Sequence, residues 1–119
     1  KYKRVLFMGI SAGGYASILF GSMCNNVTSV ISFIPQTILK KPINKKYSNL
    51  KTIINKNTKY ILYADKSVGN INDLHHISHC ENIECFTNVN IFKNNGCNMK
   101  ELRDSGFIKK IIDGALNFS

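Results

Sequence analysis

Short apolar runs alternate along the chain with segments whose apolar residues recur at helical spacing. The first run, from Val5 to Ile10, is continuous and of strand length, which is typical of a parallel strand covered on both faces. Similar β-rich runs predict three further strands, over residues 27–34, 59–64 and 89–92. Apolar residues at helical spacing predict helices over residues 15–23, 47–54, 73–80 and 99–116, the last of them broken near Gly106.

Strands that alternate with helices in this way predict an α/β fold with right-handed crossovers. We expect a mostly parallel sheet of about four strands with flanking helices, formed by residues 1–119 as a single domain. The basic, polar stretch over residues 40–58 is expected to be a surface excursion. The chain has no initiator Met and no signal-peptide pattern at its start, so we expect its native N-terminus to be missing.

The formal net charge of +9 raises the question of a nucleic-acid partner. The lysines, however, are interleaved with Asn and Ile, and the only two arginines, Arg4 and Arg103, lie at opposite ends of the chain. Base recognition favours arginine forks and stacking aromatic rings. We therefore expect a solvated basic surface, with weak attraction to polyanions and no specific nucleic acid.

No apolar run approaches the roughly 20 residues that a membrane-spanning helix needs, so no membrane span is expected. Four cysteines are present, and their spacings match neither a zinc module nor a small disulfide scaffold. Four cysteines with such spacings are typical of reduced thiols in an intracellular protein. We therefore expect a cytoplasmic location, with no metal and no cofactor.

The segment from Gly9 to Gly13 fits the pattern G-x-S-x-G and stands directly between a predicted strand and a predicted helix. A serine in such a turn adopts a strained backbone, and its glycine neighbours allow the close packing that the turn requires. The turn would project the Ser11 hydroxyl above the sheet and direct the Ala12 N–H at a developing oxyanion. A phosphate-binding turn is the alternative, but the G-x-G-x-x-G spacing is absent.

With this motif, residues 5–16 resemble the α/β-hydrolase superfamily. The remaining order of elements resembles the second half of that fold, so the resemblance covers essentially the whole chain. Only the strand-to-helix turn around Ser11, which is called the nucleophile elbow in that superfamily, is a specific match. It implies a partial α/β-hydrolase fold that lacks its N-terminal strands. It further implies a serine esterase or acyl hydrolase in which Ser11 is the nucleophile and the Ala12 N–H belongs to the oxyanion hole.

In that superfamily the acid of the triad follows the strand that corresponds to residues 59–64. Asp65 and Asp73 both qualify; Asp65 lies so close to the strand that a turn role suits it better, and we favour Asp73. The histidine is expected in the loop after the last strand, where this chain has Cys97 and Asn98 instead. Neither is a suitable general base.

All three histidines (His75, His76 and His79) follow Asp73 closely. On a helix over residues 73–80, Asp73 and His76 would share one face and could pair. This spacing favours His76 as a general base that is displaced from the loop after the last strand. The alternative is that the three histidines belong to an exposed polar helix face without a catalytic role.

Two functions of different classes follow from these residues. The first is a serine hydrolase or acyltransferase that acts on an ester or thioester of a small molecule, carbohydrate or lipid. The second is a catalytically inactive pseudo-hydrolase that serves as a binding or interaction module, and a basic nucleic-acid-associated protein is a weaker third. Because the strand from Val5 to Ile10 is apolar and would form an open sheet edge, we expect an N-terminal segment or a partner chain to cover it.

Overall fold

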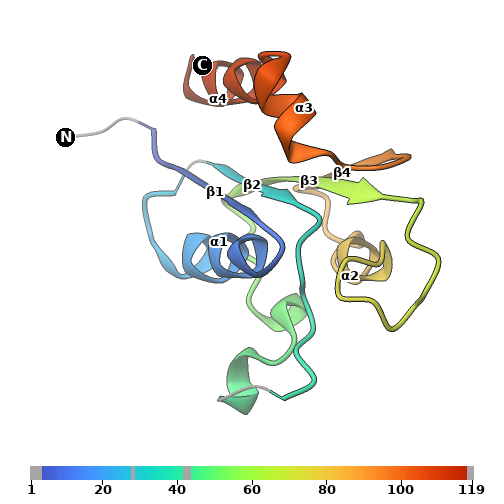
Figure 1. Cartoon of the computed structure of the whole chain (residues 1–119). Helices are drawn as coiled ribbons and strands as arrows, with labels where there is room; N and C mark the ends of the chain where they lie inside the picture. Colours follow the sequence, from blue (N-terminus) through green and yellow to red (C-terminus); the bar gives the residue numbers. More distant parts are fainter. Residues whose placement is uncertain (1–3, 28, 42–43, 118–119) are drawn as a thin grey trace.

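A computed structural model of the chain describes residues 4–27, 29–41 and 44–117 (Figure 1). Its four strands are β1 (Leu6–Ile10), β2 (Ser29–Phe33), β3 (Lys59–Asp65) and β4 (Val89–Asn94). Its four α-helices are α1 (Ala12–Met23), α2 (Ser78–Glu81), α3 (Met99–Asp104) and α4 (Phe107–Asn117). Two 3-10 turns, Lys45–Tyr47 and Leu50–Thr52, lie between β2 and β3.

The four strands form one sheet in the order β1-β2-β3-β4, and all three neighbouring pairs are parallel. Each crossover carries the chain back along a face of the sheet, which is why parallel strands follow one another here. The carboxyl ends of β1, β2 and β3 therefore meet at one edge, with Ile10 opposite Phe33 and Phe33 opposite Tyr63. This architecture confirms the predicted α/β fold with flanking helices.

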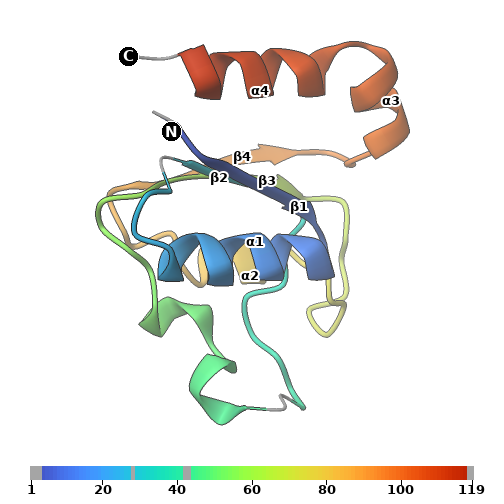
Figure 2. The same ribbon diagram turned by 90° about the vertical axis from the view of Figure 1, so that its left-hand side faces the viewer.

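The sheet is the middle of three layers. Helices α1 and α2 lie on one face, and α3 and α4 lie on the other (Figures 1 and 2). The first face holds a core that includes Ile18, Val30 and Leu62, and the second holds a smaller core around Ile31 and Phe33. All five residues of β2 are buried, as expected for an interior strand with both faces covered.

Two predicted helices are wrong in detail. Residues 47–54 do not form a helix; they contain only 3-10 turns, which begin after Asn44 and Asn49, whose side chains accept backbone N–H hydrogen bonds two residues on. Residues 73–80 are helical only from Ser78, because the Asp73 carboxylate accepts the His75 backbone N–H at 2.8 Å and makes a turn. The predicted break near Gly106 is confirmed, at a φ of 80°.

Strand β1 stands at the edge of the sheet, and no strand of the described residues pairs with its outer side. Met8 and Ile10 on this strand are about two-fifths exposed, and Phe20 on the adjoining helix α1 is half exposed. Covering of this edge by an N-terminal segment or a partner chain stays a prediction. None of the helices in the described ranges has the length and apolar character needed to cross a membrane.

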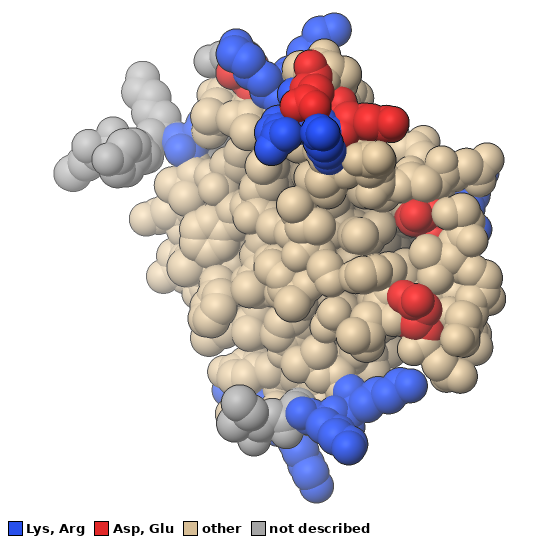
Figure 3. Space-filling view, in the orientation of Figure 1, with Lys and Arg blue, Asp and Glu red and all other residues tan. Residues whose placement is uncertain are grey.

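Charged side chains are unevenly spread over the face shown in Figure 3. Lysine and arginine gather over α3 and α4 at one end, where acidic side chains lie among them, and near the 3-10 turns at the other end. The broad area between them is largely uncharged and has acidic side chains on its right-hand side. The positive charge of the chain is thus divided on this face rather than joined into one basic surface. The predicted weak attraction to polyanions remains a prediction.

Helix α1 packs closely on the sheet because two of its glycines leave room. A Cβ atom added to Gly21 would lie 2.4 Å from Cγ2 of Val30, and one added to Gly14 would lie 3.0 Å from Pro35. Gly9 on β1 is equally constrained, since its Cβ would lie 2.0 Å from the carbonyl oxygen of Gly13. The close packing predicted for both motif glycines, Gly9 and Gly13, is therefore found at Gly9 but not at Gly13, where an added Cβ would have no neighbour within 4 Å. Gly14, outside the motif, is the second closely packed glycine of the turn.

We expect Gly21→Ala to lower the free energy of unfolding by about 1–3 kcal/mol, because α1 must move away from β2 or Val30 must leave its rotamer. Gly13→Ala in the same helix is the matched control and should leave stability unchanged or raise it by up to about 1 kcal/mol. Urea denaturation of both variants measures the difference. Equal stabilities would contradict the close approach of α1 to the sheet.

Candidate active site

Ser11 occupies the turn between β1 and α1, as predicted. Its backbone has φ 55° and ψ −115°, a sparsely populated conformation that costs on the order of 1–3 kcal/mol. Surrounding hydrogen bonds hold it there: the Ser11 N–H donates to the Phe33 carbonyl at 2.9 Å, and the Ser11 carbonyl accepts the Tyr15 N–H at 3.0 Å. The ends of two neighbouring strands thus maintain a strained turn that presents the serine hydroxyl.

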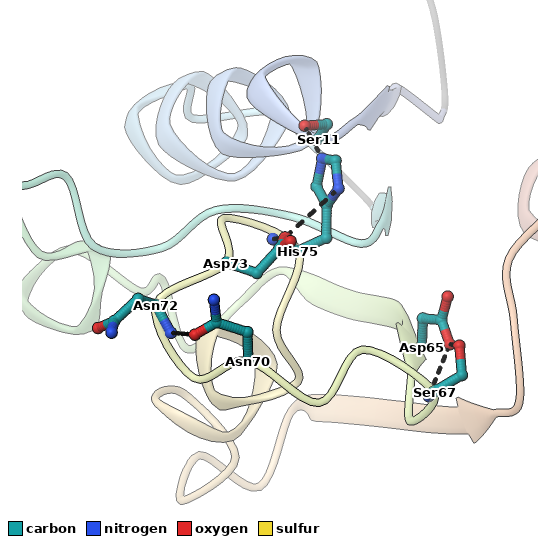
Figure 4. A network of polar contacts seen from close by, with 7 residues as sticks. All are labelled: Ser11, Asp65, Ser67, Asn70, Asn72, Asp73 and His75. Carbon is teal, nitrogen blue, oxygen red and sulfur yellow. Dashed lines mark hydrogen bonds and ion pairs between the residues drawn. The ribbon is translucent and has the colours of Figure 1, made fainter.

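His75 is the histidine that meets Ser11. Its Nε2 lies 2.7 Å from the serine Oγ, although 64 positions separate the two residues along the chain. Figure 4 shows the imidazole reaching from the loop after β3 toward the start of α1. A nucleophile and a base within hydrogen-bond reach are the core of a serine-based acyl-transfer site.

His76, the predicted base, is placed elsewhere: its Nδ1 accepts the Ser78 backbone N–H at 3.1 Å. Its prediction depended on a helix that would bring it onto the face of Asp73. The turn that Asp73 forms replaces that helix and directs His75 to the serine. An Asp two residues before a histidine was the signal for such a turn, because aspartate side chains accept backbone N–H bonds two positions on.

Asp73, the predicted acid, lies beside His75 rather than paired with His76, and its role as the acid stays a prediction. One carboxylate oxygen accepts the His75 backbone N–H, and the same atom is 3.8 Å from Nδ1 of the ring. That separation is an ion-pair distance rather than a hydrogen bond. The two side chains are 45% and 42% exposed, so solvent screens their attraction.

Asp65, the alternative acid, has a different role. It accepts hydrogen bonds from the Ser67 N–H at 2.8 Å and the Gly96 N–H at 2.7 Å, and it stands apart from the Ser11–His75 pair in Figure 4. Partial burial raises the pKa of Asp65, but hydrogen bonds from Ser67, Gly96 and Cys97 outweigh it and bring the pKa below its ordinary value. The carboxylate joins the loops that follow β3 and β4.

The loop after β4, where the superfamily would carry its histidine, has structural contacts here. Asn98 is the N-cap residue directly before helix α3, and its side chain accepts the Glu101 N–H at 3.2 Å. Burial, with the nearby Asp65 charge, raises the pKa of the Cys97 thiol and so disfavours a reactive thiolate. Neither side chain has a hydrogen bond to Ser11 among the described residues.

Ala12 is the first residue of α1 and is exposed. Its N–H is one of the first N–H groups of the helix, which have no partner inside the helix and carry the positive end of its dipole. This position suits an oxyanion that develops beside Ser11. In the described part of the chain no three His, Cys, Asp or Glu side chains come together to hold a metal ion.

No protein-family model and no curated protein matches this chain at a significant level. The fold and the site therefore define it only as a four-stranded parallel α/β protein with a serine at a strained strand-to-helix turn and a histidine against that serine.

His79 fixes the loop after β2 to the loop that carries the site. Its Nδ1 accepts the Thr37 N–H at 2.9 Å, and its carbonyl accepts the Thr37 hydroxyl at 2.7 Å. Burial lowers the pKa of His79, and the neighbouring His76, His75 and Lys40 lower it further. The neutral ring is thus the form that the fold requires.

Because the pKa of His79 is lower in the folded chain than its ordinary value near 6.5, neutral His79 contributes its full share of stability above about pH 6.5. This contribution is lost as the pH falls toward the pKa that His79 has in the folded chain. Between pH 7.5 and 5, His79→Asn, which keeps an acceptor without a titrating ring, should lose less thermal stability than the unmodified chain. We expect a difference of roughly 2–3 °C, because solvent screening limits the effect. Because His76 adds to the lowering of the His79 pKa, His76→Asn should lose a smaller part of the pH dependence than His79→Asn. Identical pH profiles for all three proteins would contradict the assignment.

Proposed function

We propose that this chain is a serine hydrolase of the α/β-hydrolase type that cleaves an acyl ester or thioester. The observation that carries the proposal is the 2.7 Å separation of Ser11 Oγ and His75 Nε2 at a strained strand-to-helix turn. The superfamily resemblance of residues 5–16 agrees with it. The base would be displaced from the superfamily's usual loop into the segment after β3.

The chemistry uses groups that lie together. With the ring proton on Nδ1, Nε2 accepts the serine hydroxyl proton while Oγ attacks the carbonyl carbon of the substrate. The Ala12 N–H stabilises the negative oxygen of the tetrahedral intermediate. As the intermediate collapses, the imidazolium donates its proton to the leaving alcohol or thiol, and an acyl-serine remains.

Hydrolysis of the acyl-serine repeats the sequence with water. His75 takes a proton from the attacking water and returns it to Ser11 Oγ as the carboxylic acid leaves. The Asp73 carboxylate, 3.8 Å from Nδ1, favours the imidazolium that forms in each step. Because this carboxylate is half exposed, its contribution is expected to be smaller than that of a buried acid.

A groove of about 410 Å³ adjoins the loop that carries Asp73 and His75. Leu74, between these two residues, lines it together with Ile38 and Ile71, and all three side chains are at least two-fifths exposed. Polar and charged side chains, Lys40 and Glu81 among them, also line this groove, and neither Ser11 nor His75 does. Its three exposed apolar side chains lie on or beside the loop that carries His75, which favours an acyl chain as part of the substrate. We therefore include a short to medium acyl chain in the proposed substrate.

An inactive pseudo-hydrolase is the second candidate, and the loop after β4 favours it. That loop carries no histidine, and Asp65, at the end of β3, is bound to Ser67 and Gly96 rather than to an imidazole. Under this hypothesis the Ser11–His75 contact is a structural hydrogen bond that joins the elbow to the loop after β3.

Hydrolysis of p-nitrophenyl butyrate separates the two hypotheses. We expect weak activity, since Asp73 and His75 are both more than two-fifths exposed and solvent screens their attraction. Ser11→Ala should abolish it, His75→Gln should lower kcat at least 10²-fold, and Asp73→Asn should lower it less. His76→Gln is the matched control and should retain activity. Activity that survives Ser11→Ala, or no activity and no labelling of Ser11 by a fluorophosphonate, would favour the pseudo-hydrolase.

The groove predicts a preference for longer acyl chains. The unmodified chain should give a higher kcat/KM for p-nitrophenyl hexanoate than for the acetate, and Ile71→Ser should reduce that ratio by about three- to tenfold. Leu116→Ser, an exposed apolar change on α4, is the control and should leave the ratio unchanged. Equal effects of both substitutions would exclude the groove as the acyl site.

A further inference from the structure

A second groove, of about 300 Å³, lies on the opposite face of the sheet, between helix α4 and strands β2 to β4. Figure 2 shows α4 running along this face. The groove includes Ser29 and Lys59, the first residues of β2 and β3, which lie opposite each other in the sheet. Ser11 follows the other end of β1, so this groove does not belong to the candidate active site.

The floor of the groove is apolar. Ile61 and Tyr63 on β3 and Phe92 on β4 line it, and the Tyr63 and Phe92 rings are stacked with centroids 5.2 Å apart. Phe92 remains 51% exposed although it lies beneath the helix layer. Exposed aromatic surface inside a groove is stabilised when an apolar ligand covers it.

Helix α4 forms the other wall. Ile111, Gly114 and Ala115 line the groove, and a Cβ atom placed on Gly114 would have no neighbour within 4 Å. A larger side chain at this position would have room, so the space over the floor is open rather than closely packed. The wall therefore accommodates a narrow, flexible chain.

Positive charge gathers at the rim. Arg4, Lys59 and Lys110 line the groove, and no carboxylate does. Neither Arg4 nor Lys110 has an ion pair within the described ranges. The nearest acid along α4, Asp113, lies 3.0 Å from Lys109 Nζ instead and does not line the groove.

We propose that this groove binds a single acyl chain with an anionic head, with the chain on the apolar floor and the head between Arg4 and Lys110. The head is a carboxylate or phosphate, and the ligand is either a free amphiphile or a lipid of an anionic bilayer. A nucleotide fits less well. It would match the cations and the Phe92 ring, but the aliphatic side chains of Ile61, Ile111 and Ala115 offer no partners to the polar edge of a base.

Calorimetric titration of the 119-residue chain with dodecanoate, below micelle formation, tests the free-ligand arm. Dodecanoate should bind, and dodecanol, which has the same chain without the charge, should bind at least about fivefold more weakly. Lys110→Gln should weaken dodecanoate binding by about the same factor. Lys109→Gln, the neighbouring cation outside the groove, is the matched control and should have no effect. Gly114→Leu should block the groove and abolish binding.

Co-sedimentation with phosphatidylglycerol vesicles, against phosphatidylcholine vesicles, tests the bilayer arm. Binding that requires the anionic lipid and is lost in Lys110→Gln but not in Lys109→Gln supports the same groove with a bilayer lipid as ligand. The proposal is overturned by an absence of binding in both arms, by equal losses in the two lysine variants, or by ATP displacing dodecanoate. Because Lys110→Gln changes an exposed side chain, the test does not depend on the folding of Gly114→Leu.

Discussion

The hydrogen bond from the Ser11 N–H to the Phe33 carbonyl, at 2.9 Å, joins the ends of β1 and β2 at the point where the chain turns into α1. The position of the candidate nucleophile depends on this contact. Together with the Tyr15 N–H that the Ser11 carbonyl accepts, it offsets the cost of a backbone at φ 55° and ψ −115°. Gly9 and Gly14 make the contact possible, since a Cβ on either would collide with the Gly13 carbonyl or with Pro35. Strain at the serine is thus maintained by packing that lies one strand away.

The same edge of the sheet organises the loops that complete the site. Ile34, directly after β2, also has a positive φ, of 42°, and its N–H donates to the Tyr63 carbonyl on β3 at 2.7 Å. From there the chain reaches Thr37, whose backbone and hydroxyl bind His79. His75 therefore approaches Ser11 from a loop that is anchored to β2 through Thr37 rather than from a rigid helix.

Much of this arrangement could be predicted from the sequence because its signals are local. Continuous apolar runs give the buried parallel strands, and G-x-S-x-G between a strand and a helix gives the elbow. The partner of Ser11 was less predictable, because two readings of residues 73–80 were physically reasonable. Helical spacing favoured His76, whereas the Asp73 carboxylate accepts the His75 N–H and forms a turn that brings His75 to the serine. The competition between a side-chain turn and a short helix depends on tertiary contacts such as that of His79 with Thr37, which no sequence pattern shows.

The solvent exposure of the His75 and Asp73 side chains limits the catalysis that Ser11 and His75 can perform before a substrate covers them. His75 and Asp73 are each more than two-fifths exposed, so water screens the attraction that would favour a charged imidazole. Hydrogen bonds to a developing oxyanion are likewise weaker in contact with bulk water than in a closed site. An apolar acyl group in the groove beside Leu74 would exclude part of that water and strengthen these interactions. Under the proposed mechanism, an apolar substrate thus contributes to catalysis by desolvating the site that acts on it, and a small polar ester gains little from the same residues.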